Sequence, residues 1–137
     1  MAVVKPFRGL RPPAHLVSEI ACLPYDVMNS EEAAAMATGK EKSLLHITKA
    51  EIDLPEGTDV HSEEVYRKAF ENFTEWQKKG WLVDDRQNHF YIYAQTMNDR
   101  TQYGIVGAAA VTDYLSGVIK KHELTRPDKE EDRMVHV

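Results

Sequence analysis

The sequence predicts an α+β fold, with a small mixed or antiparallel sheet and helices packed on it in two layers. Residues 61–79 carry apolar side chains at helical spacing. Residues 90–96 and 102–111 are rich in strand-forming residues and flank Asn98-Asp99, a pair that tolerates turn conformations. Because helices and strands are mixed along the chain and the clearest strand pairing is antiparallel, the α+β class follows.

Composition limits the classes of function. The chain of 137 residues is expected to form a single domain, and its 42% hydrophobic and 28% charged residues are typical of a folded soluble protein. The net charge of −5 argues against a general nucleic-acid binder, since such proteins normally carry a basic face, so no nucleic-acid partner is expected. No apolar run approaches the roughly 20 residues of a bilayer-spanning helix, so no membrane partner is expected. Cys22 is the only cysteine, which fits a cytoplasmic location.

The N-terminal half is expected to contain short elements. In chain order they are an extended segment over residues 1–13, a helix over 14–22, a helix from Asn29 or Ser30 to Gly39, and a strand over 43–48. His46 lies in that predicted strand, where a hydrogen-bonded structural role is favoured over a role as a ligand. Cys22 lies among apolar neighbours, which favours a small buried residue over a reactive thiol.

The helix over residues 61–79 is expected to pack over the sheet. Its apolar stripe consists of Val65, Ala69, Phe73 and Trp76, widened by Tyr66 and Phe70. In the second hairpin strand, Gly104, Gly107 and residues 108–110 have little side chain. Something bulky is therefore expected beside this strand, and a packed helix is favoured over a ligand.

A highly charged run at residues 120–133 is the candidate site. His122 can transfer protons near neutral pH, and Glu123 can orient it or act as a base. Lys129 and Arg133 are four residues apart, so a helix would place them on one face as an anion clamp. The alternative, which composition alone favours, is a solvated helix with many ion pairs.

Metal chemistry in this run is restricted. A zinc-protease helix needs a second histidine four residues after His122, but Arg126 occupies that position. A magnesium ion held partly by Glu123, Glu130 or Asp132 and partly by a substrate phosphate remains a second possibility, because magnesium often binds in this way.

Four segments in order resemble a known family. They are Pro6–Pro12, Leu23–Val27, Leu45–Thr48 and the charged segment from Lys121 to Arg133. Together they are similar to the uncharacterised family called domain of unknown function 1015. Members of that family are longer, so the chain is expected to be an N-terminal portion. Farther along they carry an Asp-Gly-His-His-Arg signature similar to the ParB and sulfiredoxin superfamily, and this sequence does not contain it.

The resemblance implies part of a nucleotide-dependent phosphotransferase acting on a small hydroxyl compound, with a nucleotide and magnesium as cofactors. It marks seven motif positions, and the chemistry of each residue type suggests the roles. His122 and Glu123 are assigned to catalysis, Thr125, Lys129 and Arg133 to phosphate or nucleotide, and Glu130 and Asp132 to metal. The chain alone is expected to be inactive and to need the missing C-terminal part as a partner. The alternative is a non-catalytic module that binds a ligand or a protein. A ParB-like role on DNA is disfavoured by the acidic charge balance.

Overall fold

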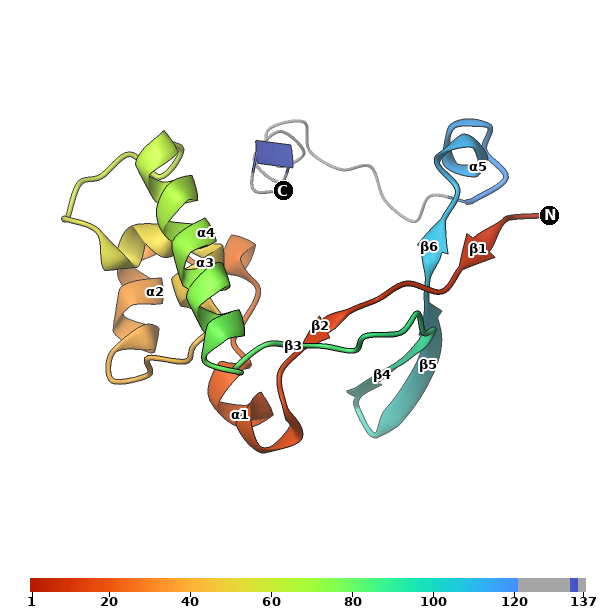
Figure 1. Cartoon of the computed structure of the whole chain (residues 1–137), viewed down its shortest axis with the longest axis horizontal. Coiled ribbons are helices and arrows are strands. Elements are labelled where there is room, and N and C mark those ends of the chain that lie inside the picture. The colour runs from red at the N-terminus through yellow and green to blue at the C-terminus, as the bar shows by residue number, and fades with distance from the viewer. Residues whose placement is uncertain (121–133, 136–137) are drawn as a thin grey trace. The chain divides into compact units, whose positions relative to one another are not determined.

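The computed structural model describes residues 1–120 and 134–135 (Figure 1). This part of the chain divides into two compact units, which we call the strand unit (residues 1–10 and 84–120) and the helical unit (residues 11–83 and 134–135). Helices and short antiparallel strand pairs occur together, so the predicted α+β class is confirmed. The expectation that the chain forms a single domain stays a prediction, since the division into two units does not test it.

The helical unit contains seven short or medium helices. In order they are η1 (Ala14–Leu16), α1 (Val17–Ile20), η2 (Tyr25–Val27), α2 (Ser30–Ala37), α3 (Leu45–Thr48), η3 (Ala50–Asp53) and α4 (Glu63–Lys78). The start of α2 agrees with the sequence, because Asn29 and Glu32 form a capping box. The Asn29 side chain accepts from the Glu32 backbone N–H at 2.8 Å, and the Glu32 carboxylate accepts from the Asn29 N–H at 2.9 Å.

The strand predicted over residues 43–48 is wrong, because α3 occupies this segment. The Thr48 N–H donates to the Leu44 carbonyl at 3.0 Å, and the Lys49 N–H donates to the Leu45 carbonyl at 2.8 Å. Leu45 packs among α2 residues, whereas Leu44 and Ile47 pack against a second cluster around Trp76. A short buried run of this kind cannot be assigned to helix or strand by periodicity alone, and tertiary packing decides.

The α4 helix has the predicted stripe with two differences. Val65, Ala69 and Trp76 are buried, but Phe70 is 68% exposed and does not widen the stripe. Asn72, which the sequence analysis did not single out, is buried at the same face. Gly80 follows the helix with φ of +71°, a left-handed conformation that glycine adopts without strain.

Every buried hydrophobic side chain in the described part of the chain lies in the helical unit. These residues form three clusters: Leu16, Ile20, Trp76 and Leu82; Ala33, Ala37 and Leu45; and Ala50, Val65 and Ala69. The first cluster joins the start of the unit to its end, which are about 60 residues apart in the sequence. The helical unit therefore has its own hydrophobic core.

Short strands pair two by two. β1 (Val4–Lys5) pairs with β6 (Ala108–Ala109), β2 (Leu10–Arg11) with β3 (Val83–Asp84), and β4 (Tyr91–Met97) with β5 (Arg100–Val106); α5 (Val111–Leu115) follows. The β4–β5 hairpin matches its prediction. Its turn residues Asn98 and Asp99 have φ of +49° and +60°, as a two-residue hairpin turn requires.

The expected helix beside the small residues of the second hairpin strand is not found among the described residues. At Gly107, an added Cβ would lie 2.7 Å from Val4 and 3.0 Å from Phe90, so side chains from within the strand unit provide the close contact. At Gly104, no atom of the described residues lies within 4 Å of such an atom. The expectation is therefore wrong for Gly104, and at Gly107 the neighbour is not a helix.

Candidate functional site

The predicted site lies outside the described residues. This applies to His122, Glu123, Thr125, Lys129, Glu130, Asp132 and Arg133. Within residues 1–120 and 134–135, no group of three or more histidine, cysteine, aspartate or glutamate side chains is arranged to hold a metal ion. No helix described in this range is both long and apolar enough to cross a membrane.

His46 belongs to a polar network that joins three helices of the helical unit. Its Nδ1 lies 2.8 Å from Asp53 Oδ1, and its Nε2 lies 3.1 Å from the Lys40 carbonyl oxygen. The buried amide of Asn72 donates both of its hydrogens, at 2.6 Å to the His46 carbonyl and at 2.8 Å to Asp53 Oδ2. The network thus ties α3, η3 and α4 together.

This arrangement makes His46 a structural residue. Both ring nitrogens lie within hydrogen-bond distance of a protein oxygen, so both are engaged in contacts within the helical unit. The role agrees with the sequence-based preference, although the residue lies on a helix and not on a strand. Asn72 could have been found from the sequence, because it is spaced three residues after Ala69 and four before Trp76 on the apolar stripe.

A second ion-pair network also has a structural role. Glu51, whose side chain is 8% exposed, accepts at Oε1 from Ser30 Oγ at 2.7 Å and from Lys49 Nζ at 3.0 Å. It lies on the wall of a shallow depression of about 550 Å³ between α2, η3 and the following loop. Removing one partner of such a buried pair leaves an uncompensated charge, so the contacts fasten η3 to the start of α2.

The family-like segment Pro6–Pro12 has a packing role around one glycine. The Gly9 N–H donates to Tyr91 Oη at 2.8 Å, and Tyr91 Oη donates to Asp85 Oδ2 at 2.6 Å. A Cβ at Gly9 would lie 2.6 Å from that hydroxyl oxygen. Glycine at this position therefore lets the N-terminal segment approach the start of β4.

Arg8, a basic residue of the N-terminal segment, has an acidic partner within the strand unit. Arg8 Nε lies 3.2 Å from Asp84 Oδ2, with both side chains largely exposed. Exposed pairs of this kind contribute about 0–1 kcal/mol to stability. Arg8 is thus partly neutralised within the strand unit.

Cys22 is a partly buried thiol that packs against the α2 and α3 cluster. Burial raises the pKa of the thiol above its ordinary value, and a hydrogen bond with the Leu45 backbone lowers it by less. Since the thiolate is the reactive form, this environment favours an unreactive thiol at neutral pH. The residue fits the predicted packing role.

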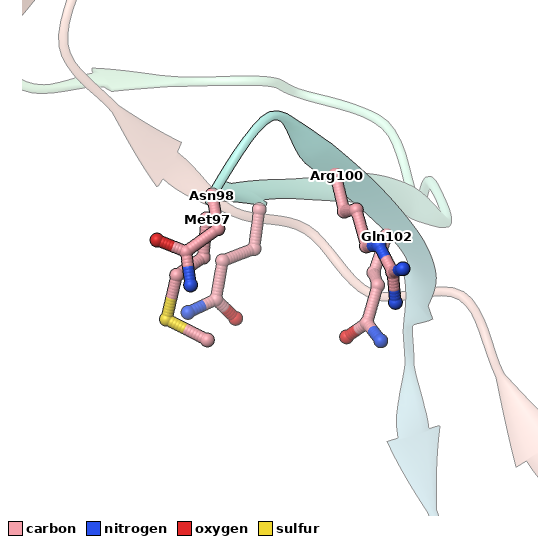
Figure 2. A pocket seen from close by; sticks show the side chains of 5 residues that line it. Met97, Asn98, Arg100 and Gln102 are labelled. Atoms are coloured by element: carbon pink, nitrogen blue, oxygen red, sulfur yellow. The ribbon is translucent and has the colours of Figure 1, made fainter.

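The tip of the β4–β5 hairpin forms a shallow polar pocket of about 510 Å³ (Figure 2). Its lining residues are Gln95, Met97, Asn98, Arg100 and Gln102. In the hairpin register Gln95 lies opposite Gln102, and Met97 lies opposite Arg100, so these four side chains share one face. The pocket offers amide groups and one cationic guanidinium, with no acidic lining residue.

The opposite face of the same hairpin is apolar and exposed. Ile92 lies opposite Ile105, and Tyr103 is next along that face, with exposed fractions of 80%, 78% and 75%. Single exposed apolar residues are ordinary on protein surfaces, whereas these three form a contiguous group on one face of the strand pair. The sequence predicted the strands but not this exposure, because an alternating pattern does not show whether anything covers the apolar face.

Comparison with known proteins defines the family of the chain. The model of the family described as "Protein of unknown function (DUF1015)" matches residues 4–137. The chain therefore belongs to this family, and the resemblance that the four sequence segments suggested is confirmed. No match was found among curated proteins or among solved structures.

Proposed function

We propose that the chain contributes one wall of a nucleotide-dependent phosphotransferase site, which the missing C-terminal part of the protein completes. The observation that supports this proposal is the charged segment from His122 to Arg133, which lies within the residues matched by the family model. The substrate would be a small hydroxyl compound, and the chain by itself would be inactive. We also propose that the family is related to the ParB and sulfiredoxin superfamily and that the protein is cytoplasmic.

The chemistry of phosphoryl transfer suits these residue types. Catalysis of this reaction depends on positioning and on neutralising charge on the phosphoryl oxygens. Lys129 and Arg133, with the Thr125 hydroxyl, would bind the phosphate or nucleotide, and Glu130 and Asp132 would hold magnesium jointly with it. His122 or Glu123 would accept the proton of the attacking hydroxyl.

The test uses the full-length protein, because the proposed site is incomplete without its remainder. Adding ATP or ADP with magnesium should raise its melting temperature, since a ligand that binds the folded state stabilises it. Glu123→Gln and Arg133→Ala should each abolish nucleotide turnover, while Glu71→Gln, on the exposed side of α4, should retain it. Full activity in both site variants would refute the assignment.

A second candidate is a non-catalytic module that binds a ligand or a protein. The exposed apolar face of the hairpin favours it, because such faces are usually covered by a partner. A panel of nucleotides that leaves the melting temperature of the full-length protein unchanged would support this candidate over the phosphotransferase.

A further inference from the structure

We infer that the open edge of β5 binds an extended segment of a partner protein in which apolar residues alternate with acidic ones. This inference concerns the hairpin alone and is independent of whether the charged segment handles phosphate. Such binding, in which a peptide adds a strand to a sheet, takes affinity from backbone hydrogen bonds and specificity from alternate side chains.

Within the described residues, the outer edge of β5 is unpaired and carries few protective features. Among the described residues, β4 and β5 pair only with each other, so each has an outer edge in this part of the chain. Native edge strands are usually protected by proline or by several charges. Neither strand contains proline, and Arg100, at the first position of β5, is the only charged residue in the two.

The two faces of the hairpin specify the alternation. Successive residues of an added strand would point to opposite faces. On one face they would meet Ile105 and Tyr103, which are more than 70% exposed. On the other they would meet Arg100 and Gln102 at the polar pocket (Figure 2). Apolar side chains fit the first face, and hydrogen-bond acceptors fit the second.

The guanidinium of Arg100 at the pocket favours acidic side chains as the hydrogen-bond acceptors of the bound segment. No hydrogen bond or ion pair involves the Arg100 side chain among the described residues, and the pocket lining contains no carboxylate. A guanidinium binds a carboxylate through two parallel hydrogen bonds, and the amides of Gln95 and Gln102 can donate to the same group. Asp99 precedes Arg100 in the turn but does not line the pocket.

The same charge argument disfavours a second copy of this chain as the occupant. If β5 paired with β5 of another copy, Arg100 would meet only side chains of β5, and neither hairpin strand contains an acidic residue. A separate partner strand with glutamate or aspartate at alternate positions gives Arg100 a counter-charge. The seven residues of β5 would accommodate a segment about 24 Å long.

The experiment titrates the full chain with a fluorescent, end-blocked heptapeptide of alternating valine and glutamate, at low ionic strength. Saturable binding is expected, and a matched peptide with lysine in place of glutamate should bind at least tenfold more weakly. Arg100→Glu should reverse this preference. Because Arg100 is exposed, its replacement should leave the fold intact, which circular dichroism would verify.

A second variant tests the apolar face. Ile105→Lys places a charge at the strand edge and should reduce binding of the glutamate peptide at least tenfold. Phe70→Lys is the matched control, because Phe70 is a similarly exposed apolar residue on α4; it should bind like the native chain. No saturable binding at millimolar peptide, equal affinity for both peptides, or no effect of Ile105→Lys would overturn the inference. A concentration-dependent dimer that Ile105→Lys abolishes would assign the edge to a second copy instead.

Discussion

The helical unit and the β4–β5 hairpin use apolar residues in opposite ways. In the helical unit, Leu45 and Val65 are at most 2% exposed and lie in clusters that join several helices. In the hairpin, Ile92 and Ile105 are about 80% exposed. The first region buries its apolar surface against itself, whereas an isolated two-stranded hairpin cannot do so and is marginally stable at best. The difference separates the residues that maintain the fold from those available for recognition.

The largest expected difference in stability is between two variants that shorten one apolar residue, one in each region. Leu45→Ala should lower the free energy of unfolding by about 2–5 kcal/mol, because it leaves a cavity in a closed cluster. Ile105→Ala, at an exposed position, should change it by no more than about 0.5 kcal/mol. Urea unfolding followed by tryptophan fluorescence measures the first effect, since both tryptophans lie in the helical unit. Equal losses in the two variants would remove the contrast.

The second-largest expected loss of stability comes from breaking the polar network around Asn72 in the helical unit. Asn72→Ala removes both donors to His46 and Asp53 and leaves their acceptors unsatisfied, so a loss of about 1–3 kcal/mol is expected. Glu71→Ala, at the exposed neighbouring position, should have little effect. The same urea titration compares the two, and an unchanged midpoint for Asn72→Ala would show that the network does not stabilise the unit.

Alanine substitutions at two glycines of the strand unit compare a closely packed position with an open one. Gly9→Ala should cost about 1–3 kcal/mol, because the new methyl group would displace the Tyr91 hydroxyl from its hydrogen bonds. Gly104→Ala should be nearly neutral, because no described residue lies within 4 Å of its added Cβ. Amide hydrogen exchange of β4 and β5 reports on this unit. The cost of Gly9→Ala should also shrink in a Tyr91→Phe background.

The smallest effect concerns an exposed ion pair at the end of α4. A hydrogen bond from Lys79 lowers the pKa of Glu75 below its ordinary value. Because the folded-state pKa is lowered, the stabilisation is present above the unfolded-state pKa and is lost as pH falls through the folded-state value. The melting-temperature difference between the native chain and Glu75→Gln at pH 7 should therefore vanish near pH 2. A difference that persists there would have another cause.

The sequence predicted correctly those elements whose turn residues or apolar spacing agree with the packing found in the structure. The hairpin was predictable because Asn98 and Asp99 suit positive φ, and α4 because its stripe repeats over four turns. The helix α3 was not predictable, because four residues contain too little periodicity and their apolar side chains face two different clusters. Tertiary contacts determine the conformation there.

The candidate site was less predictable than the fold. Its seven residues lie outside the described part of the chain, so their roles stay predictions. The polar pocket at the hairpin tip was missed for a different reason. Gln95 and Gln102 are ordinary strand residues in the sequence, and only the register places them opposite each other beside Arg100. Exposure and pairing are properties of the folded chain, and no short motif encodes them.

The two-residue turn of the hairpin has a kinetic consequence. It pairs Met97 with Arg100, which are close in the sequence. The first core cluster, in contrast, contains Leu16 and Trp76, which are far apart in the sequence. Local contacts lose little loop entropy, and hairpins close in about 1–10 μs. We therefore expect refolding to show an early tyrosine signal from the hairpin and a later tryptophan signal from the helical unit. A single common rate for both probes would contradict this order and would indicate that the hairpin forms only together with the helical core.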